Sequence, residues 1–250
     1  MTQKQNIASP RILAEGAAII ASILLAFWID AWWEGREQDE LGQRYLVGLR
    51  EDFAQIESEL GEHIAFTAGV MRSAEKVLTM ASGPDSELLT DSFSKTLGDT
   101  YSLNAPNLTT PTYHDMINSG NLRLVRDSAL RMKMAELISL MQNIDEQAGV
   151  INETYWLHHA SFMDKHFVVS EFGWYSNPSS QTAKERFRIM GKPPQSPFDI
   201  DVSAVRTREF WNLIYDWTVT HGDQLGPSIA AKSLCRELLV MLDEEIGATI

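Results

Sequence analysis

The pattern of hydrophobic and polar positions divides the chain into an apolar opening segment and a series of amphipathic stretches. From Ile12 to Trp33 the sequence is almost wholly apolar. About 22 residues of helix measure roughly 33 Å, which is enough to cross a hydrocarbon layer of ~30 Å. The pattern therefore predicts a transmembrane helix over residues 12–33, preceded by a short cytoplasmic tail over residues 1–11.

The two ends of the predicted span have the side chains expected at a membrane interface. Glu15 and Asp30 lie near opposite ends, where short carboxylates reach headgroup water, and Trp28, Trp32 and Trp33 gather at one end like an aromatic belt. A cleavable signal peptide is the main alternative. No small-residue cleavage site follows the apolar run, so we interpret the segment as an uncleaved anchor.

One face of the predicted span carries small residues, Ala14, Ala18 and Ser22, at helical spacing. Small residues let helices approach closely in lipid, so this face predicts either self-association or simply an alanine-rich span without a partner. Glu15 also has two interpretations. It is either a functional intramembrane carboxylate or half of an interfacial ion pair with Arg11, and we favour the ion pair.

The charges on either side of the span indicate its orientation. Lys4 and Arg11 precede it without an acid, whereas four acids and one arginine follow within residues 34–40. A short positive tail is hard to translocate. We therefore expect the amino terminus in the cytoplasm and the domain in the periplasm, anchored in the inner membrane of a bacterium.

Beyond the span, residues 34–250 are expected to form a helical domain. A seven-residue apolar rhythm predicts one long amphipathic helix over residues 37–80, continuing from the span. His63 and Thr67 interrupt this stripe. The stripe is expected to pack against later helices or against copies in an oligomer, and its apolar positions are Leu46, Leu49, Phe53, Ile56, Leu60, Val70, Ala74 and Val77.

Apolar periodicity and turn signals predict further helices over residues 86–97, 111–118, 129–167, 203–221 and 227–246. Gly222, Gly226 and Pro227 are expected to separate the last two. The segment 168–202 reads as irregular and is longer than an ordinary connection. The fold class is therefore all-α, with an N-terminal transmembrane helix running into a long amphipathic helix, followed by an extramembrane helical bundle.

Composition restricts the function. The formal net charge of −13 argues against a nucleic-acid partner, because phosphate binding needs a concentrated basic surface. Cys235 is the single cysteine, which excludes an intrachain disulfide, and its apolar surroundings predict a buried structural thiol.

No residue constellation in the sequence points to catalysis. There is no nucleophile elbow, no phosphate-binding glycine loop and no dinucleotide fingerprint. His158, His159 and His166 do not have the three- or four-residue spacing of helical metal ligands. We expect no enzymatic activity, no metal and no cofactor.

Two stretches resemble a family of bacterial single-span membrane proteins that is classed only as a domain of unknown function. The first follows its opening E…G…LAL.I…W.E.R pattern at Glu15-Gly16, Leu25-Ala26, Ile29-Asp30, Trp33-Glu34 and Arg36. The second is similar to its SGNL…LR signature and consists of Ser119, Gly120, Asn121, Leu122, Leu130 and Arg131.

Phe27 and Trp28 stand where that family has a polar exit from the span. The resemblance implies membrane localisation and no known reaction. The turn Ser119–Leu122 is a candidate motif site, although a helix terminator at Gly120 explains it adequately.

These observations leave three functional hypotheses. The first is a membrane-anchored interaction or assembly protein, which is a homo-oligomer or a partner of another membrane protein. The second is a module that senses or binds a small extracytoplasmic ligand through a pocket between bundle helices. Since only about 11 residues precede the span, such a signal would need a partner. A membrane-bound hydrolase is the third and least supported.

Overall fold

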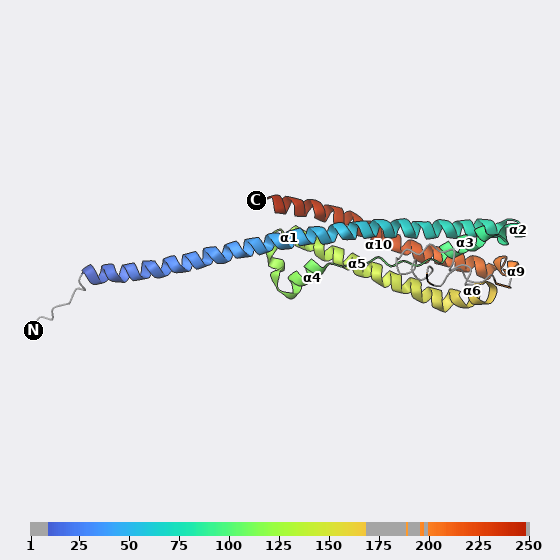
Figure 1. The fold of residues 1–250 in the computed structure, drawn as a ribbon, viewed down its shortest axis with the longest axis horizontal. Helices are drawn as coiled ribbons and strands as arrows, with labels where there is room; N and C mark the ends of the chain where they lie inside the picture. The colour runs from blue at the N-terminus through green and yellow to red at the C-terminus, as the bar shows by residue number, and fades with distance from the viewer. Residues whose placement is uncertain (1–9, 169–188, 190–195, 198–199, 249–250) are drawn as a thin grey trace, which may run out of the picture.

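The computed structural model describes residues 10–168, 189, 196–197 and 200–248 of the chain. Regular structure within these residues is helical, without a β-strand, which confirms the all-α class. The helices form an elongated bundle from which the N-terminal part of the first helix projects alone (Figure 1).

Helix α1 (Pro10–Ser82) is a single helix of 73 residues. At 1.5 Å per residue it is about 110 Å long. The expected span and the expected amphipathic helix 37–80 are therefore consecutive parts of one element. Gly35 and Gly42 do not interrupt it, so no change of direction is built in between the apolar segment and the bundle.

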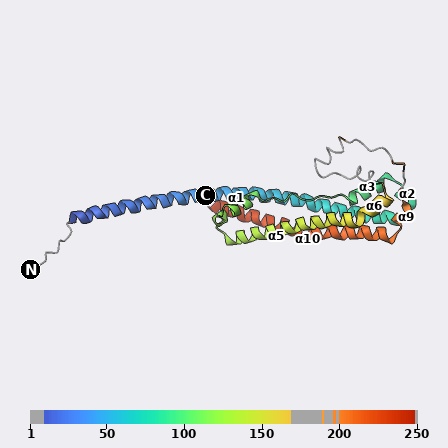
Figure 2. The same cartoon turned by 90° about the horizontal axis from the view of Figure 1, so that it is seen from below.

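Helix α10 (Arg208–Ala248) packs along the second half of α1, and α5 (Ser128–Thr154) in turn packs along α10 (Figures 1 and 2). The eight apolar positions predicted to form the stripe of α1 are all buried. One large apolar cluster fills the half of the bundle nearer the projecting segment, around Leu49, Phe53 and Leu238. Another surrounds Phe93 and Phe210 at the far end.

The prediction of one helix over residues 86–97 is wrong. Two short helices, α2 (Asp85–Leu88) and α3 (Asp91–Thr100), occupy this region. Thr90 separates them because its hydroxyl accepts the Phe93 N–H at 3.3 Å and so begins a new helix. By contrast, α4 (Pro111–Asn118) has the predicted bounds.

The predicted helix 129–167 begins as expected but is not uniform. Asp127 accepts the Ala129 N–H at 2.8 Å as the N-cap of α5. A π-turn, η2 (Tyr155–His159), then follows α5, and α6 (Ala160–His166) completes the stretch. A single π-turn of this kind inserts an extra residue into a helix and is frequent at functional sites.

The expected break between helices 203–221 and 227–246 is also wrong. A short α9 (Val202–Val205) is followed by the continuous α10, with Pro227 inside it. Gln224 and Ser228, on either side of the proline, are both buried against the bundle. Packing along both halves of α10 therefore outweighs the hydrogen bond that proline removes. Most of the expected irregular segment 168–202 lies outside the described residues.

Replacing Pro227 by Ala is expected to stabilise the bundle by about 1–3 kcal/mol, because alanine restores the missing backbone donor in a helix interior. Gly226→Ala in the same turn is the matched control. A Cβ at Gly226 meets nothing within 4 Å, so that variant should gain only about 1 kcal/mol. Denaturant unfolding followed by circular dichroism measures both. A Pro227→Ala variant less stable than the parent would show that α10 needs the proline geometry for its packing.

Candidate functional site

The apolar part of α1 lies outside the bundle, with its large side chains exposed on every side. Phe27 is 68% exposed, and Trp28 and Trp33 are each 65% exposed. Within the described residues, α1 is the helix long and apolar enough to cross a membrane. Trp32 and Trp33 contact each other, with ring centroids 6.3 Å apart, at the end of this segment nearer the bundle.

The small-residue face of the predicted span is present on this segment. Ala18 and Ser22 are exposed one turn apart, and the Ser22 hydroxyl donates to the Ala18 carbonyl oxygen. The hydroxyl is therefore satisfied within its own helix. Glu15 and Asp30 are exposed near the ends of the apolar run. The side chain of Ala14 lies outside the described part.

The motif turn packs against α1 where the bundle begins. Gly120, with φ of 71°, has the left-handed conformation predicted for the residue that ends α4. The Tyr45 hydroxyl donates to the Asp115 carboxylate at 2.8 Å, and the Asn121 amide donates to the Tyr45 oxygen at 3.2 Å and to Ser119 Oγ at 2.9 Å. The Ser119 hydroxyl is thus part of a structural network rather than a free nucleophile.

Leu122 completes the turn by packing against the first apolar cluster. The motif therefore connects α4, the 3₁₀ helix η1 (Asn121–Leu124) and the start of the bundle portion of α1. Its observed geometry attaches the end of the bundle nearest the apolar segment to α1.

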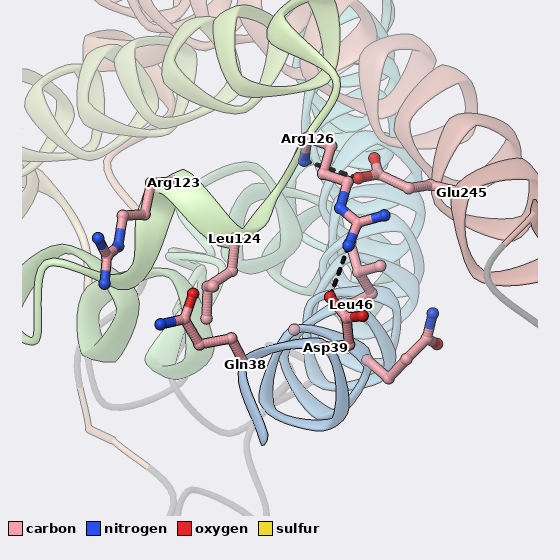
Figure 3. A pocket seen from close by; sticks show the side chains of 9 residues that line it. Gln38, Asp39, Leu46, Arg123, Leu124, Arg126 and Glu245 are labelled. Atoms are coloured by element: carbon pink, nitrogen blue, oxygen red, sulfur yellow. Dashed lines mark hydrogen bonds and ion pairs between the residues drawn. The ribbon is translucent and has the colours of Figure 1, made fainter. Parts of the chain in front are cut away.

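A surface pocket of about 210 Å³ lies beside this turn, at the end of the bundle nearest the apolar segment (Figure 3). Arg126 joins three segments there: its guanidinium lies 2.6 Å from Asp39 on α1, and its backbone N–H donates to Glu245 on α10 at 2.8 Å. Both charged side chains of the Arg126–Asp39 pair are more than half exposed, so the pair adds little stability. The pocket lies where α1, α10 and the connection between η1 and α5 meet.

Replacing Tyr45 by Phe is expected to lower the free energy of unfolding by about 1–2 kcal/mol, because Asp115 and Asn121 lose a shared partner. Tyr215→Phe is the matched control, since Tyr215 is 66% exposed on α10, and it should change stability by less than about 0.5 kcal/mol. Equal effects of the two substitutions would mean that the network does not hold the motif turn to α1.

A layer of buried polar side chains crosses the middle of the bundle between the apolar clusters. It consists of His63, Thr67, His221, Gln224 and Ser228, each at most 2% exposed. Both ring nitrogens of the two histidines and both hydroxyl groups lack a hydrogen-bond partner among the described residues. Each such atom costs about 1–3 kcal/mol, so we name these residues the central polar layer and regard it as the weakest section of the core.

The central polar layer continues into an aromatic cluster around the π-turn. His159 is fully buried there, its Nδ1 is 2.9 Å from the Tyr101 hydroxyl, and its Nε2 is 3.6 Å from the Asp216 carboxylate. Trp217 lies between two histidines, with ring centroids 5.1 Å from His159 and 4.7 Å from His221. Its indole N–H donates to the Thr100 carbonyl at 2.6 Å.

Burial controls the protonation of these groups. It lowers the pKa of His63 and of His159, and together with the nearby His63 it lowers the pKa of His221 to about 4. Burial also raises the pKa of Tyr101. A neutral Tyr101 donating to Nδ1 leaves the His159 proton on Nε2, facing Asp216. The three buried histidines are therefore neutral at pH 7.

The three histidines whose spacing was compared with that of helical metal ligands do not lie close to one another. His158 is exposed, His159 faces Tyr101, and His166 pairs with Asp201 at 2.8 Å between Nδ1 and the carboxylate. No group of three or more histidine, cysteine, aspartate or glutamate side chains suited to a metal ion occurs among the described residues. Cys235 is buried, as predicted.

Sequence reasoning missed the role of the central polar layer. His63 and Thr67 are polar residues at positions of the apolar stripe, and the structure places them in the core in register with it. His221 lies beside the expected helix break, where the sequence predicts no core position. The available signal was their helical spacing, because His221, Gln224 and Ser228 recur every three or four residues along one face.

Comparisons with family models, with curated proteins and with solved structures found no match for this chain. The resemblance to a bacterial single-span family therefore stays a prediction.

Acidification is expected to destabilise the bundle through the buried histidines. Their folded-state pKa values lie below 6.5, so the unfolded chain binds protons first and stability falls as pH drops below 6.5. His221 alone, with a pKa of about 4, accounts for a loss of about 3 kcal/mol by pH 4. Denaturant titrations at pH 7, 6, 5 and 4 measure this slope.

The variant His221→Leu should flatten the slope and raise stability at pH 5, whereas His158→Gln, on an exposed histidine, should leave it unchanged. An unaltered slope in the His221→Leu variant would contradict burial of a neutral histidine at this position.

Proposed function

We propose that this chain is a membrane-anchored helical interaction protein, with the apolar part of α1 in the bilayer and the bundle held at one membrane face. The observation that carries the proposal is the exposure of the apolar segment on every side, while the rest of the same helix is packed into the bundle. Contiguous apolar surface of this extent belongs in lipid or against another protein.

The details of the segment support a spanning rather than a surface-lying helix. Its apolar side chains surround the helix instead of forming one stripe, which suits lipid on all sides. Asp30 and Glu15 lie toward its ends, and Trp28, Trp32 and Trp33 define an interfacial level. The first packed turns of the bundle begin about nine residues, or ~14 Å of helix, after Trp33.

The proposed location is the inner membrane of a bacterium, with the amino terminus in the cytoplasm and the bundle in the periplasm. The support is the positive charge of Lys4 and Arg11 before the span. The acidic bundle, within a chain of net charge −13, is not suited to broad contact with anionic headgroups. The span itself would then provide most of the membrane affinity.

Assembly is proposed to occur through the face that carries Ala18 and Ser22. Their short side chains allow a second helix to approach closely, and the Ser22 hydroxyl is already satisfied by its own helix. Because α1 continues into the bundle without a break, an association of spans would also fix the separation of the bundles. The partner is a second copy of this chain or another single-span protein.

Cysteine crosslinking in native membranes tests this proposal. The native Cys235 is buried, and burial raises the pKa of its thiol to about 12, so it stays unreactive. Ala18→Cys and Ser22→Cys place a new thiol on the proposed face, and Ile20→Cys places one about 160° away on the same helix.

The proposal predicts one discrete crosslinked species for Ala18→Cys and Ser22→Cys after mild oxidation, at several times the yield for Ile20→Cys. Its mass identifies a homodimer or a complex with another protein. Equal yields at the three positions, or no product at any of them, would rule out assembly through this face. Recovery of the chain in the soluble fraction after alkaline extraction would rule out the anchor itself.

A further inference from the structure

A second pocket, of about 330 Å³, lies on the side of the bundle, against the first apolar cluster. The connection between α3 and α4, residues 101–110, passes along α5 and encloses the pocket against it. This volume lies at the lower end of the range found for small-molecule sites. The ligand-binding hypothesis predicts a pocket between bundle helices, whereas this pocket lies between α5 and a connection.

Apolar side chains form about half of the pocket wall. Leu108 from the connection faces Ile138, Met141 and Ile144 from α5, and the last two are at most 8% exposed. All four belong to or pack against the first apolar cluster of the bundle. A ligand there would contact a surface that the fold itself holds in place, which limits the ordering cost of binding.

Thr110 places a hydroxyl group in this wall. The residue is 1% exposed, and its Oγ1 has no hydrogen-bond partner among the described residues. A threonine before Pro111 would ordinarily cap the following helix. Here the carboxylate of Asp52 on α1 instead accepts the Thr112 N–H at 2.9 Å. A molecule that enters the pocket and reaches this buried oxygen would supply the missing partner.

Asp145 gives the pocket its charge. Among the lining residues it is the one carboxylate; it is exposed, and no ion pair engages it within the described part of the chain. Asn107, Gln142 and His114 add neutral polar groups, and no lysine or arginine lines the pocket. A negative charge beside an apolar wall favours a cation with an apolar body.

We propose that this pocket binds a small organic cation, namely an amine with a compact apolar body. The apolar body packs on Leu108, Met141 and Ile144, the ammonium group donates to the Asp145 carboxylate, and a polar substituent bonds to the Thr110 hydroxyl. Anionic compounds are disfavoured by Asp145. This binding proposal does not depend on the proposed membrane span or on the proposed assembly. A result that contradicts the proposed function therefore leaves the binding proposal standing, and the reverse is also true.

NMR chemical shifts of the methionine methyl groups test the proposal in the full-length protein held in lipid nanodiscs. Met141 reports on the pocket, Met134 on the neighbouring buried core, and Met132, which is 70% exposed, on non-specific association. The probes are benzylamine, cyclohexylmethylamine and pentylamine, each compared with its neutral alcohol analogue, and benzoate serves as the anion.

The proposal predicts a saturable shift of the Met141 signal with at least one of the amines, at least about fivefold tighter than with its alcohol, while Met132 stays unchanged. Asp145→Asn should weaken the amine about tenfold and Thr110→Val about threefold. Glu146→Gln, at the exposed acid next along α5, is the matched control and should have no effect. Asp145→Lys should reverse the preference and give tighter binding of benzoate.

The absence of a saturable Met141 shift with all three amines would overturn the proposal. Equal affinities for amines and alcohols would overturn the assignment of a cation. A loss of binding in Glu146→Gln as large as in Asp145→Asn would assign the effect to overall surface charge rather than to the pocket. The thermal midpoint of each variant, measured in the same nanodiscs, separates loss of binding from loss of fold.

Discussion

Packing of α10 against the second half of α1, with α5 packed in turn against α10, is the constraint from which the other features follow, because the first half of α1 is the apolar segment. A helix held along one half of its length transmits its direction to the other half, since each turn is bonded to the next. The bundle therefore sets the position of the apolar segment, and a bilayer around that segment would set the orientation of the bundle. The motif turn reinforces this arrangement by attaching α4 to α1 through Tyr45.

The central polar layer divides this packing into two sections of different character. Apolar clusters on either side supply most of the favourable burial, whereas His63, His221 and their neighbours contribute buried polar atoms at core positions. The free energy needed to open one section of a folded protein depends on how many apolar contacts that section makes. The middle of the bundle is thus expected to be its section most sensitive to pH.

Sequence reasoning predicted the parts of the structure that rest on long periodic patterns. The stripe of α1, the bounds of α4 and the turn at Gly120 all follow from local rules, and all are confirmed. It did not predict the continuity of α10, because Pro227 is a strong local signal that packing along the whole helix overrides.

The candidate sites were harder to foresee, since they depend on contacts between distant residues. The pairing of Asp52 with the start of α4, which leaves Thr110 without its usual capping role, joins residues 60 positions apart.

The most direct test of the continuity of α1 is the distance between spin labels at Leu24→Cys and Ala54→Cys, on either side of Gly35 and Gly42, in lipid nanodiscs. A continuous α1 predicts a narrow distribution near ~45 Å, and a broad distribution centred well below that value would show that the span and the bundle move independently.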